Sequence, residues 1–582
     1  MTKIWNFPHK DYMKQRSPLA FFALFLFSFL ANAQDYPQDE FISPLEMPLF
    51  LSGTFGELRT NHFHAGIDIK TGGREGQRVL AVADGFVSRI KVSPYGYGNA
   101  LYIVHPNGYT SVYGHLQRFN DTIQAFIREE QKRQKSFEVE LFPLAKVFPV
   151  KQGDLVALSG NSGGSGGPHL HFEIRDTRTE KIINPLLFGF DVKDGRSPDI
   201  YNLEVYEFDK EELVSSYTRS LLRQGDGVYS LTGNSLIEVS NPASFGITTT
   251  DRLDGVPNKN GVYSIRMIIG EEVYYHFVAE TFAFAETRYI NSHIDFAQKA
   301  CCRRTINKMY LEPNNQFSAY RVKERMKLTD LVADSIYPVN IEVSDRAGNV
   351  STLNFELKYS PPEVELAEAP EPDLPKFNYA QTNFFKKDNF QVVLPEGALY
   401  SDIYVQYEKK AACSECLSFI HEIATREVPV QKYYTLKIKP DAEYHGDKSK
   451  LFIASFKDGK LDDYEGGRWE NGFVVARTRQ FGEFAVMVDT VPPSVSPVNF
   501  RDGSNVHGAS RLSFIISDKL SGIDDYSVTI DGEWVLFEYD AKNRLIYTDV
   551  RALNLEDGER VLRISVSDDK GNVTEKTYHL IF

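Results

Sequence analysis

Cysteine is scarce in this chain, which has only four, at positions 301, 302, 413 and 416 of its 582 residues. In an oxidising compartment they allow at most two disulfides, with three possible pairings. Cys413 and Cys416 have the CxxC spacing of redox and zinc sites, but no second ligand pair accompanies them. The pattern therefore favours a local structural disulfide between these two residues.

An excess of positive charge is also missing. Lys and Arg total 65 against 79 Asp and Glu, which gives a formal net charge of −14. A chain this acidic has no general attraction to nucleic acid or to anionic lipid surfaces. We expect partners that are neutral or positively charged, or that are held by local contacts, and we expect no nucleic acid among them.

Long apolar runs are absent beyond residue 33. The one apolar run, Leu19–Leu30, follows four basic residues and ends before Ala31-Asn32-Ala33. This order is typical of a cleaved signal peptide, residues 1–33, and the run is shorter than the ~20 apolar residues that normally span a bilayer. No cysteine follows it, so a lipid anchor is not expected. The sequence predicts an exported protein with no membrane span in the mature chain.

What the chain has in abundance favours β-structure. It contains 31 Tyr and 41 Phe, and many short runs are rich in these residues and in Val and Ile, as strands are. The chain is also too long for a single hydrophobic core. Changes of texture after the signal peptide divide it into a first domain at 42–192, a β-sandwich at 195–360, a linker rich in Pro and Glu at 361–375, a β-rich domain at 376–489 and an immunoglobulin-like domain at 490–582.

One internal echo supports the sandwich prediction. The segments Val343–Val350 (VSDRAGNV) and Val566–Val573 (VSDDKGNV) are alike, and an alternating strand follows each of them. Their Gly-Asn pairs are expected to supply the positive-φ positions of tight hairpins. The echo predicts that each segment closes an immunoglobulin-like sandwich, and it carries no information about activity.

A histidine and an aspartate stand close together near the start of the first domain. His64 and Asp68 are four residues apart, with Gly66 between them. On a straight strand this spacing is about 13 Å, too long for both side chains to bind one metal ion. We expect a bend at Gly66 that leads into a strand and folds the imidazole back toward the carboxylate. Alone, the pair would indicate only a His–Asp hydrogen bond at the surface.

Three further histidines follow on predicted strands. His115 ends the return strand of a hairpin, and the insertion at Asp121–Phe137 has the apolar spacing of a short amphipathic helix. After a glycine-rich loop that lacks the Gly-Lys-Ser/Thr of a phosphate-binding loop, period-two alternation places His169, His171 and Glu173 on one face of a strand. Imidazoles two residues apart stand about 6–7 Å from each other, close enough to serve one site in different roles.

Together these side chains meet the requirements of a catalytic zinc site. Such a site needs three nitrogen or oxygen ligands and an open position for water. Zinc lowers the pKa of that water and polarises a scissile carbonyl, and nearby imidazoles can move protons or stabilise an oxyanion. The sequence therefore predicts hydrolysis with Zn2+ as the cofactor.

The three motifs also carry a family resemblance. His-x-x-x-Asp, Gly-His-Leu and His-Leu-His occur in this order, and the region 55–184 resembles the lysostaphin/LytM-type zinc metallopeptidases of the M23 class, which are peptidoglycan endopeptidases. The resemblance implies a compact antiparallel β-sheet domain. It further implies that the zinc ligands are His64, Asp68 and His171, and that the pair that activates water and stabilises the tetrahedral intermediate is His115 and His169.

No motif position is substituted, so the resemblance gives no reason to expect an inactive enzyme. The helical insertion after His115 departs from the family pattern; it could form a groove wall or a lid, and it leaves the choice of substrate open. His62 and His105 lie near the motifs but match no catalytic position. Both are predicted to be structural, with His62 also a candidate for a contact to the substrate.

Three functions remain open from the sequence. The leading hypothesis is an endopeptidase that cuts peptidoglycan stem peptides or crosslinks in the periplasm or envelope of a Gram-negative bacterium, with secretion not excluded. The alternative is a catalytically silent wall-binding regulator or activator of other cell-wall hydrolases, with envelope proteins as partners. Such relatives usually lose zinc ligands, which this chain has kept. The β-domains could also form an adhesive or glycan-binding array, although aromatic residues in strands are more often core.

Overall fold

The computed structural model describes residues 36–209, 212–322, 331–361, 373–441 and 443–582. Strands make up 48% of the chain and helices 9%, which confirms the mainly β fold class. The predicted signal peptide and residues 362–372 of the predicted linker lie outside the described residues. Of the helices in the described ranges, none combines the length and apolarity that crossing a bilayer requires.

The first domain is built on an antiparallel sheet in the order β1-β4-β13-β8-β7-β6-β10, and a smaller sheet in the order β5-β12-β9 shares its core. The strands are β1 Leu51–Gly53, β4 Ile67–Lys70, β5 Arg78–Leu80, β6 Gly85–Val92, β7 Ala100–Val104, β8 Tyr109–Gly114, β9 Leu116–Phe119, β10 Val139–Leu141, β12 Leu155–Ser159 and β13 His169–Asp176. Strand β13 lies between β4 and β8. Its central position joins the three segments that carry the predicted site.

The register of β13 decides which side chains meet. His171 stands opposite Asp68 on β4 and opposite Gly114 on β8. Residues directly opposite each other in an antiparallel pair point to the same face, so the imidazole and the carboxylate lie side by side. The chain bends before β4, as predicted, and a Cβ on Gly66 would stand 2.3 Å from the carbonyl oxygen of Phe172. Only glycine allows this close approach to β13.

The predicted helical insertion is confirmed as α1, Asp121–Gln134. The side chain of Asn120 accepts a hydrogen bond from the Ile123 backbone N–H and so caps the first turn. Ile123 and Ile127 are buried one turn apart, and they fix the helix to the core of the first domain. The spacing of apolar residues was therefore a correct guide to this element.

Three β-units follow the first domain. The sandwich contains β15 Asp199–Asp209, β16 Glu212–Gly225, β17 Val228–Leu231, β18 Leu236–Val239, β19 Ala243–Thr250, β20 Ser264–Ile269, β21 Glu272–Val278, β24 Ile336–Ser344 and β25 Val350–Tyr359, with β22 Thr281–Phe282, β23 Asn307–Lys308 and the short helices α2 Ile290–His293 and α3 Phe296–Cys302 beside it. The unit after the sandwich, which is the third unit of the chain, has two five-stranded sheets in the orders β27-β28-β32-β36-β35 and β30-β31-β37-β33-β34. The last unit has two four-stranded sheets in the orders β38-β39-β43-β42 and β41-β40-β44-β45.

The strands of the third unit are β27 Asn383–Lys387, β28 Phe390–Leu394, β30 Tyr407–Lys410, β31 Ile420–Ile423, β32 Pro429–Ile438, β33 Leu451–Lys457, β34 Lys460–Tyr464, β35 Arg468–Glu470, β36 Phe473–Gln480 and β37 Gly482–Val488. Those of the last unit are β38 Ser494–Pro497, β39 Arg511–Ser517, β40 Ile523–Ile530, β41 Glu533–Trp534, β42 Glu538–Asp540, β43 Leu545–Asp549, β44 Glu559–Asp568 and β45 Val573–Ile581. The exact domain limits drawn from the sequence stay predictions.

The two echoed segments form hairpins, β24–β25 and β44–β45, as predicted. One detail of the prediction was wrong. Gly348 and Gly571 have positive φ, but Asn349 and Asn572 are not among the described residues with positive φ. Each asparagine instead donates its side-chain amide to the aspartate that opens its own turn, at 2.7 and 2.8 Å. A side-chain hydrogen bond, rather than a second left-handed residue, closes these turns.

The cysteines pair locally. Cys413 and Cys416 form the predicted disulfide, and Cys301 is bonded to Cys302 at the end of α3. No described cysteine is free.

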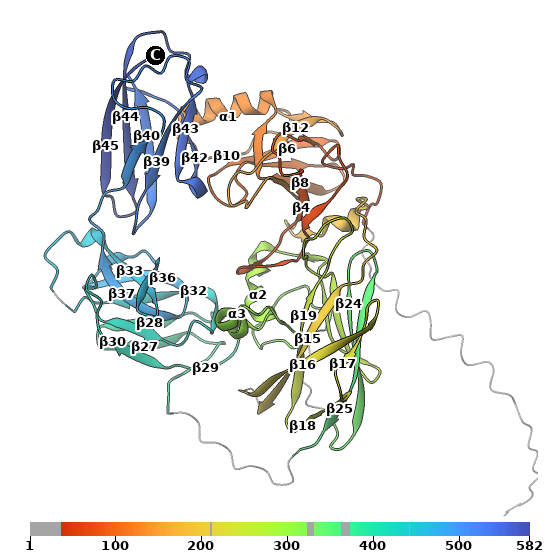
Figure 1. Ribbon diagram of the computed structural model, residues 1–582. Coiled ribbons are helices and arrows are strands. Elements are labelled where there is room, and N and C mark those ends of the chain that lie inside the picture. The colour runs from red at the N-terminus through yellow and green to blue at the C-terminus, as the bar shows by residue number, and fades with distance from the viewer. Residues whose placement is uncertain (1–35, 210–211, 323–330, 362–372, 442) are drawn as a thin grey trace, which may run out of the picture.

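The units follow one another around a closed circuit (Figure 1), in which β42 and β43 of the last unit lie beside α1 of the first domain. Arg128 of α1 forms an ion pair with Glu538. Lys542 donates hydrogen bonds to the carbonyl oxygens of Asn161 and Ser165 in the glycine-rich loop. The last unit therefore contacts both the inserted helix and the loop that precedes β13.

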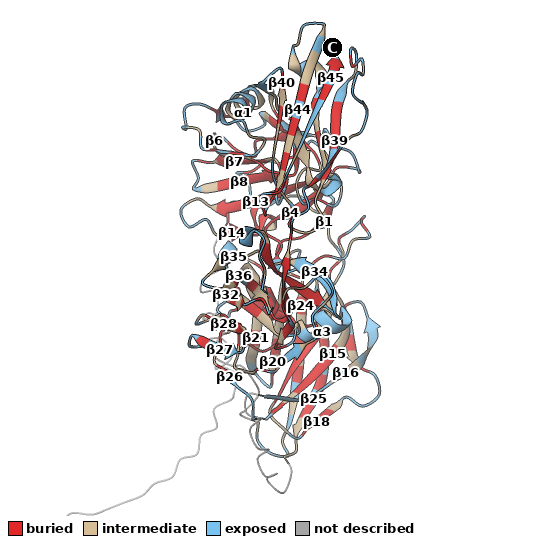
Figure 2. Cartoon of the chain, turned by 90° about the vertical axis from the view of Figure 1, so that its left-hand side faces the viewer, coloured by how far each residue is buried: buried red, intermediate tan, exposed pale blue. Residues whose placement is uncertain are grey.

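The first domain and the sandwich share a hydrophobic core. Phe63, which immediately precedes His64, is fully buried among sandwich residues. Its ring stacks on Phe317 at 4.5 Å between centroids and also contacts Phe282 and His293. Figure 2 shows buried segments in strands of both units, β4 and β13 above and β20 and β24 below. The segment that leads into His64 is therefore held in place by the neighbouring sandwich.

We expect Phe63→Ala to destabilise the junction of these two units by about 3–5 kcal/mol, because it removes a buried aromatic side chain from a closely packed core. Differential scanning calorimetry of the full chain should show the unfolding transition at a lower temperature. Phe142→Ala is the matched control, since this phenylalanine is 69% exposed. Equal transition temperatures for the two variants would contradict the shared core.

Candidate functional site

Three predicted ligand atoms converge in the first domain. His64 Nε2 lies 3.0 Å from Asp68 Oδ1 and 3.1 Å from His171 Nδ1, and His171 Nδ1 lies 3.0 Å from the same Asp68 oxygen. All three residues are buried, with 2–6% of their surface exposed. Neighbouring ligands around a tetrahedral zinc ion stand roughly 3.3 Å apart. The cluster has the size and the donor types of a metal site, and these three residues can hold a metal ion.

The outer hydrogen bonds of the two histidines fix the state of their inner nitrogens. His64 Nδ1 lies 2.8 Å from the carbonyl oxygen of Thr54, and His171 Nε2 lies 2.9 Å from a carboxylate oxygen of Glu173. Both outer partners are acceptors, so both outer nitrogens must donate. In the neutral imidazoles the inner nitrogens then carry lone pairs, and three acceptors face one another. Only a cation, either an added proton or a metal ion, satisfies this arrangement.

The pKa of His171 also shows that this cluster favours a cation. Burial lowers the pKa of this imidazole, but the carboxylates of Asp68 and Glu173 outweigh it and raise the pKa to about 9. For Asp68, burial raises the pKa, but His64, His169 and His171 more than offset this and hold it well below its usual value. The cluster attracts positive charge strongly.

Glu173 is itself fixed by a second set of contacts. Its carboxylate is fully buried and accepts hydrogen bonds from Arg175, at 2.8 Å from Nε, and from the Tyr97 hydroxyl. Burial raises the pKa of Glu173, but Arg175 and His171 outweigh it and lower the pKa to about 2. The Tyr97 ring also stacks on His171 at 4.9 Å. These contacts hold the His171 ring in one orientation, as outer contacts of metal ligands do.

Arg59 contacts the other oxygen of Asp68. Its Nη2 donates to Asp68 Oδ2 at 3.0 Å, while its Nε pairs with Glu57 at 2.9 Å. One carboxylate oxygen therefore faces the histidines and the other faces a guanidinium. This leaves Oδ1 as the oxygen available to an ion.

The remaining two predicted histidines stand at the edge of the cluster. His169 Nε2 lies 3.3 Å from Asp68 Oδ1, and the His115 and His169 rings are 4.8 Å apart between centroids. His115 Nδ1 donates to the Ser162 carbonyl oxygen at 2.9 Å, and His169 Nδ1 donates to the Gly167 carbonyl oxygen at 2.8 Å. In the neutral form, Nε2 of each ring therefore carries a lone pair, and that of His169 faces the Asp68 carboxylate.

His115 occupies an unusual backbone conformation. Its φ is +57°, a left-handed value that costs a non-glycine residue about 1–2 kcal/mol. The backbone N–H donates to the Tyr97 carbonyl oxygen at 2.8 Å, and this bond helps to hold the residue between β8 and β9. Burial, with His171 and His169 nearby, lowers the pKa of the His115 imidazole to about 3. It is neutral at pH 7.

The structure thus brings all five predicted site residues together. Sequence reasoning missed Arg59, Tyr97 and Arg175, which hold the ligands from outside. The alternation of β13 predicts the correct face for Glu173, but it does not predict that this residue contacts His171. The spacing gave no signal for Tyr97, because its contacts depend on a register between strands that are far apart in the sequence.

The other two histidines of the region have ordinary contacts. His105 is buried and lies 2.9 Å from the Asp84 carbonyl oxygen and 2.8 Å from the Ser111 hydroxyl. His62 is exposed, and its Nδ1 lies 2.8 Å from the Thr60 carbonyl oxygen. Both sets of contacts are those expected of structural residues.

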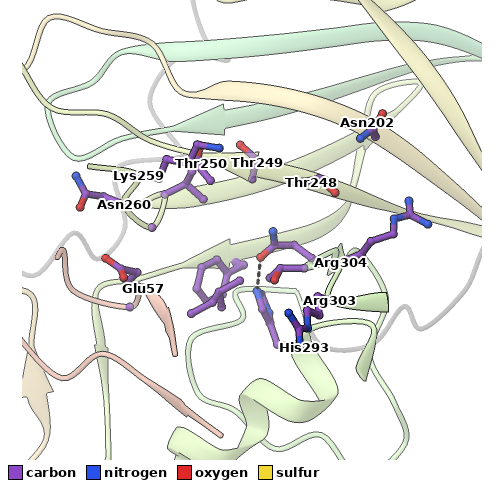
Figure 3. A pocket seen from close by; sticks show the side chains of 17 residues that line it. Glu57, Asn202, Thr248, Thr249, Thr250, Lys259, Asn260, His293, Arg303 and Arg304 are labelled. Atoms are coloured by element: carbon purple, nitrogen blue, oxygen red, sulfur yellow. Dashed lines mark hydrogen bonds between the residues drawn. The ribbon is translucent and has the colours of Figure 1, made fainter. Parts of the chain in front are cut away.

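A separate cavity of about 400 Å³ lies between the Glu57 loop and the sandwich (Figure 3). Its polar lining includes Lys259, Asn260, Arg303 and Arg304. Although all five site residues are in the described ranges, none of them lines this cavity. The metal cluster and the cavity are different features of the molecule.

Two family models match the chain. The model described as peptidase family M23 matches residues 62–132, and the model described as a Zu5-like domain matches residues 375–489. The first match includes His64, Asp68 and His115. His169 and His171 lie beyond it, after α1, and their place in the site comes from the geometry of β13.

Curated relatives align with the same region. The murein hydrolase activator NlpD of Escherichia coli is 37% identical over 123 residues, which are 21% of this chain and 25% of that protein. The DD-carboxypeptidase/endopeptidase Mpg of Neisseria meningitidis serogroup B is 33% identical over 118 residues, 20% of this chain and 21% of that protein. The chain spans about a fifth to a quarter of the length of the curated relatives it matches.

Among solved structures, the catalytic domain of the antimicrobial peptidase lysostaphin from Staphylococcus simulans is 22% identical. The match covers 25% of this chain and 93% of that one, with a TM-score of 0.19.

Metal binding should depend on pH, because His171 is protonated at pH 7 in the absence of metal and the ion must displace that proton. Since the pKa of His171 is about 9, we expect the apparent zinc affinity to rise about tenfold per pH unit between pH 6 and 8. Titration calorimetry in buffers of different protonation enthalpy should give release of about one proton. The His171→Ala variant is the control, and an affinity of the wild type that does not change with pH would refute the prediction.

Removal of the Glu173 charge should weaken metal binding. Glu173→Gln keeps the shape of the side chain but reduces its pull on the His171 N–H, and we expect a 10- to 100-fold loss of zinc affinity. Competition with a chromogenic chelator measures it. Glu140→Gln is the matched control, because Glu140 also pairs with an arginine, Arg89, but near the surface of the same domain. Equal affinities of the two variants would show that Glu173 has no role in the site.

Proposed function

Because this chain contains a peptidase family M23 domain, we propose that it is a zinc-dependent endopeptidase that hydrolyses peptide bonds in peptidoglycan stem peptides or crosslinks. One observation carries the proposal: three acceptor atoms of His64, Asp68 and His171 meet within 3.0–3.1 Å, beside the imidazoles of His115 and His169. A structural metal site would have no need of the two additional imidazoles.

In this proposal His64, Asp68 and His171 hold the zinc ion. When bound, zinc supplies a water of lowered pKa and polarises the scissile carbonyl. His115 is neutral at pH 7 and can take the proton of the attacking water at Nε2 and deliver it to the leaving amine. His169, once protonated at Nε2, donates to the developing oxyanion. The bonds of both Nδ1 atoms to carbonyl oxygens keep the two Nε2 atoms directed at the reacting groups.

The proposed substrate also fits the expected location. Residues 1–33 have the order of a signal peptide, and the relatives include proteins named for murein and for carboxypeptidase or endopeptidase activity. We propose that the mature chain works in the periplasm or envelope of a Gram-negative bacterium. Other envelope proteins are proposed partners.

The test is mass spectrometry of muropeptides released from purified cell walls by the zinc-loaded full chain. We expect peptide-bond cleavage, and a 10²- to 10⁴-fold lower rate for His115→Ala and for His169→Ala with zinc content unchanged. His171→Ala should lose both zinc and activity.

His445→Ala is the matched control, since its side chain is 81% exposed, and it should behave as the wild type. Intact walls after treatment with fully zinc-loaded protein would refute the enzymatic proposal. Full activity of His169→Ala would refute the assigned role of that histidine.

A second candidate function rests on the similarity to murein hydrolase activators. A chain of that kind would stimulate a separate cell-wall hydrolase without cutting peptide bonds itself. The wild type and His169→Ala should then stimulate the partner equally, because stimulation needs only the fold. Our proposal expects the wild type to cleave walls without any added hydrolase.

A further inference from the structure

A second group of possible ligands lies where the chain enters the sandwich. Asp194 belongs to the segment before β15, Asp251 follows β19, and Asp345 opens the β24–β25 turn. One carboxylate oxygen from each residue lies within 4.8 Å of those from the other two. Asp251 and Asp345 are only 3% and 4% exposed. Three carboxylates thus share a largely dry space at a junction between two units.

One buried oxygen in this group has no partner. Asp251 Oδ1 is inaccessible to solvent and accepts no hydrogen bond from the described part of the chain. Beside it stands Asn260, whose backbone exchanges hydrogen bonds of 3.0 and 2.8 Å with that of Asp251. The Asn260 side-chain oxygen and nitrogen are also buried, and neither has a partner among the residues that the structure describes. A buried polar atom without a hydrogen-bond partner lowers the stability of the fold by about 1–3 kcal/mol, and by more when the group is charged. A bound ligand that contacts these atoms would remove this cost.

The three carboxylates of this group stand close enough to oppose one another's ionisation. Burial, reinforced by Asp194 and Asp345, raises the pKa of Asp251 to about 8. Burial likewise raises the pKa of Asp194 to about 7, against a weaker opposing hydrogen bond from Arg196. The strongest charge effects on Asp251 come from other aspartates. Its neighbourhood therefore favours a cation.

The last unit contains a second cluster of three aspartates, with which the first can be compared. Asp489, Asp518 and Asp568 occupy equivalent places: before the unit, after β39 and in the β44–β45 turn. There, both oxygens of Asp489 and both of Asp568 accept hydrogen bonds. Asp518 is only half-buried and accepts three backbone N–H groups at Oδ2. In the first cluster Asp345 accepts the same kind of donors at both oxygens, and Asp194 Oδ1 accepts the Arg196 N–H. The difference lies at Asp251, whose Oδ1 has no donor among the described residues.

We propose that Asp194, Asp251 and Asp345 bind one Ca2+ ion at the entrance to the sandwich. Carboxylates are hard oxygen ligands of the type calcium prefers, at 2.3–2.6 Å from the ion. Two oxygens on opposite sides of one ion then stand about 4.8 Å apart, and the observed separations stay within this limit. Nitrogen and sulfur ligands of the kind zinc favours do not belong to this set.

The ion would join three segments that the chain connects only loosely. Asn349 already donates to the Asp194 carbonyl oxygen at 3.2 Å and to Asp345 at 2.7 Å. Calcium would add a strong link between the segment leaving the first domain, the end of β19 and the closing hairpin. The site therefore fixes how the first domain is held on the sandwich, and it is independent of the proposed zinc chemistry.

Calcium binding can be tested on the zinc-saturated full chain in calcium-free buffer. We expect calorimetric titration to give one Ca2+ per chain, and saturating Ca2+ to raise the unfolding temperature by about 5 °C. Asp251→Asn should abolish both effects. At pH 9, where Asp251 is ionised, the same variant should unfold at a higher temperature than the wild type without calcium, because it removes one of three neighbouring like charges.

Asp518→Asn is the matched control at the equivalent place in the last unit, and it should keep the full calcium response. The proposal fails if the wild type shows neither heat nor a temperature shift with Ca2+, or if Asp251→Asn responds as the wild type does. An equal shift with the same concentration of Mg2+ would overturn the assignment to calcium.

Discussion

The first domain depends on one electrostatic constraint: three acceptor atoms face one another in a buried space and need a cation between them. His64 and His171 turn their N–H groups outward, to a backbone carbonyl and to Glu173. This leaves two lone pairs and the Asp68 carboxylate inside. Every neighbouring contact serves to keep that arrangement in place. Arg59 occupies the second oxygen of Asp68, and Tyr97 and Arg175 hold Glu173. Without these outer contacts the ligands could rotate away and satisfy one another.

The constraint extends beyond the domain that carries the motifs. Phe63 anchors the segment before His64 in the core of the sandwich, and Phe284 of the sandwich lies against the Arg175 guanidinium at 4.6 Å. The position of the ligands is thus determined partly by residues more than two hundred positions away. The first domain and the sandwich therefore share one packed interface.

The sequence predicted the mainly β class, helix α1, the two closing hairpins and the disulfide Cys413–Cys416, because each depends on local spacing. It also grouped the five candidate site residues, since strand alternation and the bend at Gly66 fix which side chains share a face. It could not predict Tyr97, Arg59 or Phe63, whose contacts depend on the register of distant strands. The asparagines of the two hairpins were predicted with the wrong backbone conformation, because a side-chain bond to aspartate replaces a positive φ. The roles of the five residues stay predictions until variants are measured.

The contact of Lys542 with the glycine-rich loop has a consequence for biosynthesis. The ribosome completes Ser165 well before Lys542, which follows it by 377 residues. A nascent chain can therefore build the first domain while the loop that positions His169 still lacks its outer support. That support can form only when the last unit has folded back on the first, so the surroundings of His169 are complete only once the whole chain has been made.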